Sequence, residues 1–188
     1  MSVSLTREEA LGLLREEVHD ENLVKHCLAT EAIMRKMAER LGEDRETWGL
    51  VGLLHDLDFE ATKDSPQEHT KQTVDILRDR GFADEALQAV REHNAEALGI
   101  PRRSKFGIAL ACSETVTGLI VATALVYPDK RLASVKPKSV RKRMKETAFA
   151  RKVNREIIGE CERIGLPLEE FIELSLTAMR DVADSLGL

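Results

Sequence analysis

Four of the five histidines in this sequence lie on the apolar sides or at the ends of successive predicted helices: His26, His55, His69 and His93. His55 is followed directly by Asp56. A buried neutral histidine needs a hydrogen-bond partner, and a buried carboxylate needs a cation or several donors. A shared metal ion satisfies all of these groups, and imidazole nitrogen with carboxylate oxygen suits Mn, Fe, Co, Ni, Zn or Mg. The pattern predicts a metal site centred on the His-Asp pair.

A single buried histidine is more often a core residue bonded to a neighbour than a metal ligand. Four histidines on the apolar sides or at the ends of successive predicted helices favour the metal, because facing helices commonly build such sites. His19 differs, since it lies between Val18 and the acidic pair Asp20–Glu21 near a helix end. We expect His19 to be solvated and exclude it from the site.

Glu114 is the one charged residue in an apolar stretch from Phe106 to Pro128. The stretch is nearly long enough to cross a membrane. Four Ser and Thr residues interrupt it, however, and only Tyr127 resembles part of an aromatic belt. We therefore predict a central core helix rather than a membrane span. Its single acid needs a cation or strong donors, which the histidine cluster and its metal can supply.

These residues must be positioned by helices, because only 4% of the chain is aromatic and apolar residues recur at helical spacing. The sequence predicts an all-α bundle. The expected helices run from Thr6 to about Val18, Asn22 to Leu41, Glu46 to about His55, Pro66 to Gly81, Asp84 to Ala97, Phe106 to Pro128, Ser139 to Phe149, and Leu168 to Leu186.

The length of 188 residues, with no linker-like stretch, predicts one domain over residues 1–188. Within it, residues 20–127 form the expected metal-site core, and residues 130–188 hold a basic segment and the C-terminal helices. The three cysteines are widely spaced and form no CxxC pair, so we expect them to pack in the core. With no signal-peptide pattern at the N-terminus, they indicate a reducing cytoplasm.

The formal net charge of -5 argues against general nucleic-acid binding, although the charge is uneven. Residues 130–155 hold eleven Lys or Arg against one acid, Glu146. Four of these cations are candidates to neutralise a substrate phosphate: Lys136, Lys138, Arg141 and Lys142. A solvated basic face explains them equally well. The sequence leaves oligomerisation open.

The order of His26, His55-Asp56 and a distant acid in an apolar helix resembles the HD-domain superfamily of metal-dependent phosphohydrolases. Strings such as "WGLVGLLHDLDFE" and "VTGLIVATALVYPDKRLASVKPKSVRKRMKETAFA" carry the resemblance over nearly the whole chain. It implies that His26, His55 and Asp56 bind one metal, and that His69 and His93 bind a second. Glu114 occupies the position of the family's usual Asp, with one more methylene.

The resemblance implies hydrolysis of a nucleotide or another small phosphate ester by a metal-activated water, which Asp56 would orient as a catalytic residue. Two alternatives remain open at this point. Glu114 in place of Asp suits a catalytically weakened ligand-binding or regulatory protein. The same order of histidines and acids also occurs in HD-fold oxygenases with two irons.

Overall fold

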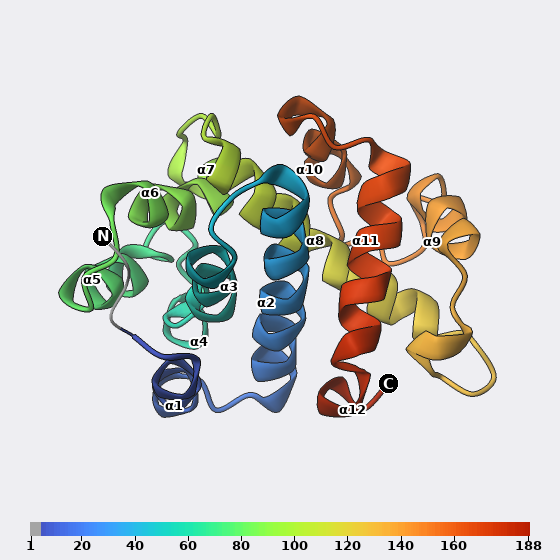
Figure 1. The fold of residues 1–188 in the computed structure, drawn as a ribbon, viewed down its shortest axis with the longest axis horizontal. Coiled ribbons are helices and arrows are strands. Elements are labelled where there is room, and N and C mark those ends of the chain that lie inside the picture. The colour runs from blue at the N-terminus through green and yellow to red at the C-terminus, as the bar shows by residue number, and fades with distance from the viewer. Residues whose placement is uncertain (1–4) are drawn as a thin grey trace.

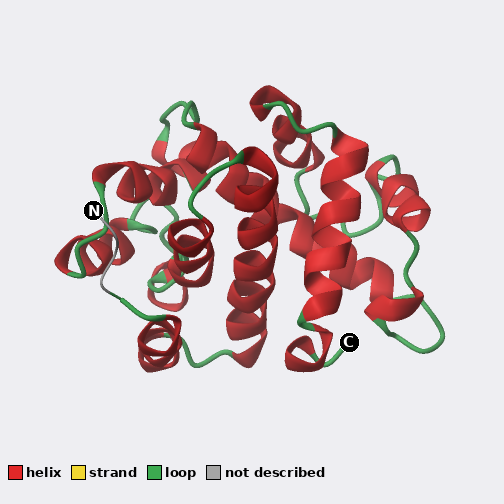
Figure 2. Ribbon diagram, in the orientation of Figure 1, coloured by secondary structure: helices red, strands yellow, loops and turns green. Residues whose placement is uncertain are grey.

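A computed structural model describes residues 5–188, and every regular element within that range is helical (Figure 2). The elements are α1 (Arg7–Glu17), α2 (Glu21–Leu41), α3 (Arg45–Leu54), α4 (Phe59–Thr62), α5 (Lys71–Asp79), α6 (Asp84–His93), α7 (Ala95–Leu98), α8 (Lys105–Leu125), η1 (Leu132–Ser134), α9 (Pro137–Met144), α10 (Arg155–Gly159), η2 (Glu160–Ile164), α11 (Leu168–Asp181) and α12 (Ala183–Leu186). The all-α prediction is confirmed.

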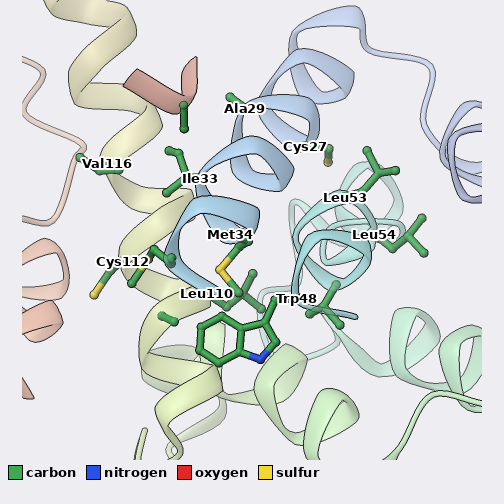
Figure 3. Packing of buried hydrophobic residues seen from close by; sticks show 14 of the residues in the cluster. Cys27, Ala29, Ile33, Met34, Trp48, Leu53, Leu54, Leu110, Cys112 and Val116 are labelled. Atoms are coloured by element: carbon green, nitrogen blue, oxygen red, sulfur yellow. The ribbon is translucent and has the colours of Figure 1, made fainter. Parts of the chain in front are cut away.

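The core is organised around α2, which packs against α3, α8 and α11. In Figure 1, α8 passes behind α2 and α11 and connects the two ends of the molecule. Close packing is clearest where α2, α3 and α8 meet: Met34 and Leu110 lie near the Trp48 ring (Figure 3). Trp48 also stacks on Phe106 of α8, with ring centroids 4.7 Å apart.

Helix α8 has the length and composition of a membrane span, but its surroundings are protein. In its most apolar 18-residue stretch, 67% is buried inside the structure. Helices α2, α6, α9 and α10 all pack against it. The apolar composition of α8 is thus explained by its central place in the bundle, as the sequence predicts.

Local signals at several helix ends are also confirmed. Thr6 and Glu9 form a reciprocal capping box at the start of α1. Gly42 ends α2 with a left-handed backbone, φ 72°, a conformation that glycine adopts without steric cost. The three cysteines are free and buried, as expected for packing residues.

The predicted helix from Pro66 is wrong at its beginning, because α5 begins only at Lys71. Thr70 has a left-handed backbone, φ 85°, which breaks the helical path. That conformation turns the Thr70 N–H toward the carboxylate of Asp58, 3.1 Å away. A tertiary hydrogen bond therefore overrides the local signal of a proline in a first helical turn.

Three other helices are shorter than predicted. The helix from Asp84 breaks at Asn94, whose side-chain amide donates to the carbonyls of Pro66 and His69. Helix α9 ends at Met144 instead of Phe149. The last helix divides at Val182, where φ is -119°, into α11 and α12.

Gly52 allows α2 and α3 to approach closely. A Cβ atom at this position would lie 2.9 Å from Cγ of Met34 and 3.1 Å from Cα of Glu31. The second contact is with backbone, which cannot move aside as a flexible side chain can. The carbonyl of Gly52 also accepts a hydrogen bond from His55, so this crossing helps to orient a candidate ligand.

We predict that Gly52→Ala destabilises the protein by about 1–3 kcal/mol, because the added methyl group overpacks the α2–α3 contact. The matched control is Gly12→Ala in α1, where a Cβ meets nothing within 4 Å. That change should stabilise the protein by up to about 1 kcal/mol through helix propensity. Denaturant unfolding measures both values, and equal effects of the two variants would contradict the packing argument.

Candidate metal centre

Five of the six residues predicted as metal ligands come together in the structure. His26 projects from α2, and His55 is the C-cap of α3, followed directly by Asp56. His69 lies in the turn before α5, and His93 is the last residue of α6. Four segments distant in sequence therefore meet at one point in the core.

The first group of ligand atoms consists of His26, His55 and one oxygen of Asp56. The two Nε2 atoms are 3.2 Å apart. Asp56 Oδ2 lies 3.7 Å from Nε2 of His26 and 3.5 Å from Nε2 of His55. Donors around a first-row divalent ion, each about 2.1 Å from the ion, are roughly 3.0–3.4 Å apart, so this spacing is close to that of a coordination sphere.

The second group consists of His69, His93 and the other oxygen of the same carboxylate. Asp56 Oδ1 lies 3.2 Å from Nε2 of His69 and 3.3 Å from Nε2 of His93. These two ring nitrogens are 3.0 Å apart. Asp56 is thus shared, with one oxygen directed to each pair of histidines.

His55 and His93 use the same local geometry, because each terminates a helix and bonds to the carbonyl three residues earlier. Nδ1 of His55 donates to the Gly52 carbonyl at 2.9 Å, and Nδ1 of His93 donates to the Val90 carbonyl at 2.6 Å. The carboxyl end of a helix carries partial negative charge and favours a cation. Buried Arg102 also donates to the His93 carbonyl, at 3.2 Å, and helps to fix this end of α6.

The other two histidines are oriented by side chains. Nδ1 of His69 donates to Asp58 Oδ1 at 2.7 Å. Nδ1 of His26 lies 3.0 Å from the Thr117 hydroxyl, which itself donates to the carbonyl of Glu114 at 2.6 Å. The hydroxyl therefore accepts from His26. In all four histidines Nδ1 carries the outward N–H, and Nε2 faces the centre.

This arrangement places acceptor atoms against each other. Neutral His26 and His55 rings that donate through Nδ1 bring two Nε2 lone pairs within 3.2 Å, with no proton between them. Buried lone pairs in this position need a donor or a cation. The donor set of imidazole nitrogens and a shared carboxylate therefore fits divalent metal, on the evidence of its own hydrogen bonds.

The charge states of the two groups differ. Burial lowers the pKa of His26, and it lowers that of His55 to about 3, so both rings are neutral. Burial also lowers the pKa of His69, but hydrogen bonds to Asp56 and Asp58 outweigh it and raise this pKa to about 9. Burial raises the pKa of Asp56, but the nearby His55 and hydrogen bonds with His69 and His93 hold it well below its usual value.

Glu114, the sixth predicted ligand, belongs to neither group of closely spaced ligand atoms among residues 5–188. Its carboxyl group accepts a hydrogen bond from the adjacent Thr115 hydroxyl. Burial, together with the charge of Asp56, raises the pKa of Glu114 to about 8 against the lowering effect of that bond. In this structure Glu114 is a mostly neutral side chain near the cluster at neutral pH.

The cluster is partly open to solvent on one side. His55 is fully buried, whereas 24% of the His26 side chain is exposed, the largest fraction among the five clustered residues. A cleft of about 490 Å³ begins at His26 and continues between α2, α8 and α12. Elsewhere in the cluster, the Phe59 ring packs edge-on against His69, with centroids 5.4 Å apart.

The four basic residues predicted to bind substrate do not line the cleft at His26. Lys138, Arg141 and Lys142 line a separate cleft between α9 and α11. Arg141 forms an ion pair there with Glu169, and Lys136 is exposed just before α9. Their role in substrate binding stays a prediction.

Sequence reasoning did not assign Asp58 or Thr117, although both orient ligands. Asp58 is fully satisfied as an acceptor, from His69 Nδ1 at 2.7 Å and from the backbone N–H groups of Thr70 and Thr73, each at 3.1 Å. The available signal was its position, a second acid two residues after Asp56 in a loop. Thr117 gave a weaker signal, as one of several hydroxyl residues in an apolar helix.

Two curated proteins are similar to parts of this chain. A tRNA (cytidine(56)-2'-O)-methyltransferase from Picrophilus torridus is 24% identical over 163 residues, which cover 83% of this chain and 47% of that protein. A Ribonuclease Y from Rhodopirellula baltica is 30% identical over 112 residues, which cover 58% of this chain and 22% of that protein. The chain thus spans less than half the length of these curated relatives.

No solved structure matches the chain. The model of the family described as "HD domain" matches residues 23–124, more than half of the 188 residues. That region contains all five clustered residues, from His26 to His93. The chain belongs to the HD domain family, a family of metal-dependent phosphohydrolases.

Proposed function

We propose that this protein is a metal-dependent phosphohydrolase that acts on a nucleotide or another small phosphate ester. The observation that carries the proposal is the sharing of Asp56 between two pairs of histidines. Its Oδ2 atom faces the Nε2 atoms of His26 and His55, and its Oδ1 atom faces those of His69 and His93. Two such sets joined by a carboxylate suit a site for two divalent ions.

Bound divalent ions would lower the pKa of a water molecule at this site to about 7 and neutralise charge on a phosphoryl group. The chain supplies the surroundings for that chemistry. His55, His69 and His93 are buried and keep solvent away from the centre. His26 lies at the open side, so substrate would arrive next to it and next to the Oδ2 side of Asp56.

The size of the adjoining cleft favours a small substrate. Its volume of about 490 Å³ lies in the range of pockets for small molecules, roughly 300–1,000 Å³. Both curated relatives have names that refer to RNA, but the chain spans less than half of each. The negative net charge of -5 gives little support to a nucleic-acid substrate.

Glu114 supports a second candidate function, that of a ligand-binding or regulatory protein with little catalysis. Its carboxyl group lies outside both ligand groups, and burial raises its pKa to about 8. A neutral carboxyl group is a poor metal ligand, because coordination needs the deprotonated oxygen. The site would then hold metal through the histidines and Asp56 alone.

Asp58 should control how firmly the second group holds metal. A carboxylate that accepts the outer N–H of a ligating histidine fixes the ring and makes its free nitrogen more basic. Asp58 does this for His69 at 2.7 Å and has no exposed side-chain surface. The equivalent partner of His26 is the uncharged Thr117 hydroxyl.

We predict that Asp58→Asn weakens metal binding at the His69–His93 group by about 10–100-fold, because loss of the outer carboxylate costs affinity of this order. Metal held by His26 and His55 should remain, so the metal content of this variant should fall toward one ion per chain. Titration against a chelator, followed by elemental analysis, measures this. The control Asp75→Asn changes an exposed acid of α5. Equal metal content and affinity in both variants would contradict the role of Asp58.

The function is tested with a panel of phosphate esters and with Mn, Fe, Co, Ni, Zn and Mg. We expect hydrolysis of at least one ester, and a loss of about 1,000-fold or more in Asp56→Ala, because both metal groups lose their shared ligand. Metal content should fall in the same variant. His19→Ala, which removes an exposed histidine outside the cluster, should keep both metal and activity.

The proposal fails if no metal copurifies and the double variant His55→Ala with Asp56→Ala keeps any observed hydrolysis. Glu114→Asp separates the two candidate functions. A gain in turnover would show a hydrolase limited by the longer side chain. With metal bound, the absence of hydrolysis in both the original protein and Glu114→Asp would favour the ligand-binding function.

A further inference from the structure

The cleft beside His26 has walls from three helices. The beginning of α2 contributes Asn22 and Lys25, and the second half of α8 contributes Gly118 and Ala122. The chain around α12 closes the remaining side. Because His26 belongs both to this cleft and to the first ligand group, a molecule in the cleft lies directly beside the candidate metal centre.

Most of the side chains in the cleft are apolar, including Ala29, Val121, Ala122 and Leu186. Leu125, at the end of α8, also lines it and is 49% exposed, although most of this helix is buried. Apolar surface grouped in a concavity gains free energy when a ligand covers it. The cleft therefore suits an apolar organic group better than a sugar with many hydroxyls or a charged chain.

Lys25 gives the cleft one positive charge. No carboxylate lies within 4.0 Å of its ammonium group among residues 5–188. By contrast, Lys36 on the same helix pairs with Asp181 at 3.5 Å. The ammonium group of Lys25 lies near Gly187, where a Cβ would be 3.4 Å from it. An unpaired ammonium group next to the ligand His26 suits an anion that also contacts the metal centre.

We propose that this cleft is the subsite for a phosphate monoester with an apolar organic group, and that Lys25 contacts the phosphate. The inference rests on the proposed function, and it names the substrate class and the residues that select it. The organic group would lie against Val121, Ala122 and Leu125, and the phosphate would lie between Lys25 and the metal centre. The basic residues of α9, which line another cleft, are not needed for this contact.

Equilibrium binding tests the subsite without turnover. Phenylphosphonate and methylphosphonate carry the same anionic group, and their P–C bonds are not cleaved by hydrolysis. Calorimetry on the metal-loaded full chain should show phenylphosphonate binding roughly tenfold more tightly, because the ring buries apolar surface. Ala122→Trp should fill the cleft and abolish this preference, while methylphosphonate binding changes less than about twofold.

Lys25→Ala should weaken both phosphonates by about tenfold, because it removes a charge from the shared anionic group. The matched controls are Ala148→Trp, at an exposed position outside the clefts, and Lys36→Ala, on the same helix as Lys25. Both should leave the two affinities unchanged. Metal content is measured for every variant, since a lost ion would also weaken phosphonate binding.

Equal affinity for the two phosphonates overturns the subsite, and so does a phenyl preference that survives Ala122→Trp. If Ala122→Trp does not fold, Leu125→Ser replaces it, with an expected loss of about threefold for phenylphosphonate alone. Ester hydrolysis with no phenyl preference would leave the proposed function intact and reject the subsite. Cleft-dependent phenylphosphonate binding without hydrolysis of any ester would support the subsite and reject the hydrolase.

Discussion

The structure depends on one buried carboxylate, that of Asp56, held among four imidazole rings. A buried charge is costly unless cations or donors compensate it. Here the compensation comes from α2, the ends of α3 and α6, and the turn before α5. The ends of α3 and α6 and the turn before α5 therefore meet at one point beside α2.

The helix ends perform two tasks at this point. At the ends of α3 and α6, the last histidine bonds back to a carbonyl three residues earlier, which fixes its ring and directs Nε2 inward. The same helix ends contribute partial negative charge, which favours a cation beside the histidines. Backbone geometry alone therefore orients two of the four rings. The other two histidines, His26 and His69, are not at helix ends and need the side chains of Thr117 and Asp58.

This difference explains which parts of the site could be predicted from sequence. His26, His55, Asp56 and His93 stand out because they lie on the apolar sides or at the ends of helices, which identifies inward-facing positions. His69 was predicted from a helix that in the structure begins only at Lys71, so its place in the turn before α5 is set by tertiary contacts. The orienting residues do not stand out, because their partners are remote: Thr117 contacts a residue 91 positions away. The false helix start at Pro66 has the same cause, since the Asp58 contacts that hold Thr70 exist only in the folded chain. Glu114 was placed in the correct helix, but its side-chain direction is decided by packing.

The two halves of the site, the His26–His55 group and the His69–His93 group, should consequently differ in how strongly they hold a cation. On the His69 side, the ring has a carboxylate partner and packs against Phe59, and hydrogen bonds to carboxylates raise its pKa to about 9, so this side favours positive charge. The His26 side has a neutral hydroxyl partner and a ring with 24% exposure at the mouth of a cleft. A ligand can therefore reach this side without displacing protein. Under the proposed function, this asymmetry would let the buried half hold charge and the open half meet substrate, with Asp56 connecting the two.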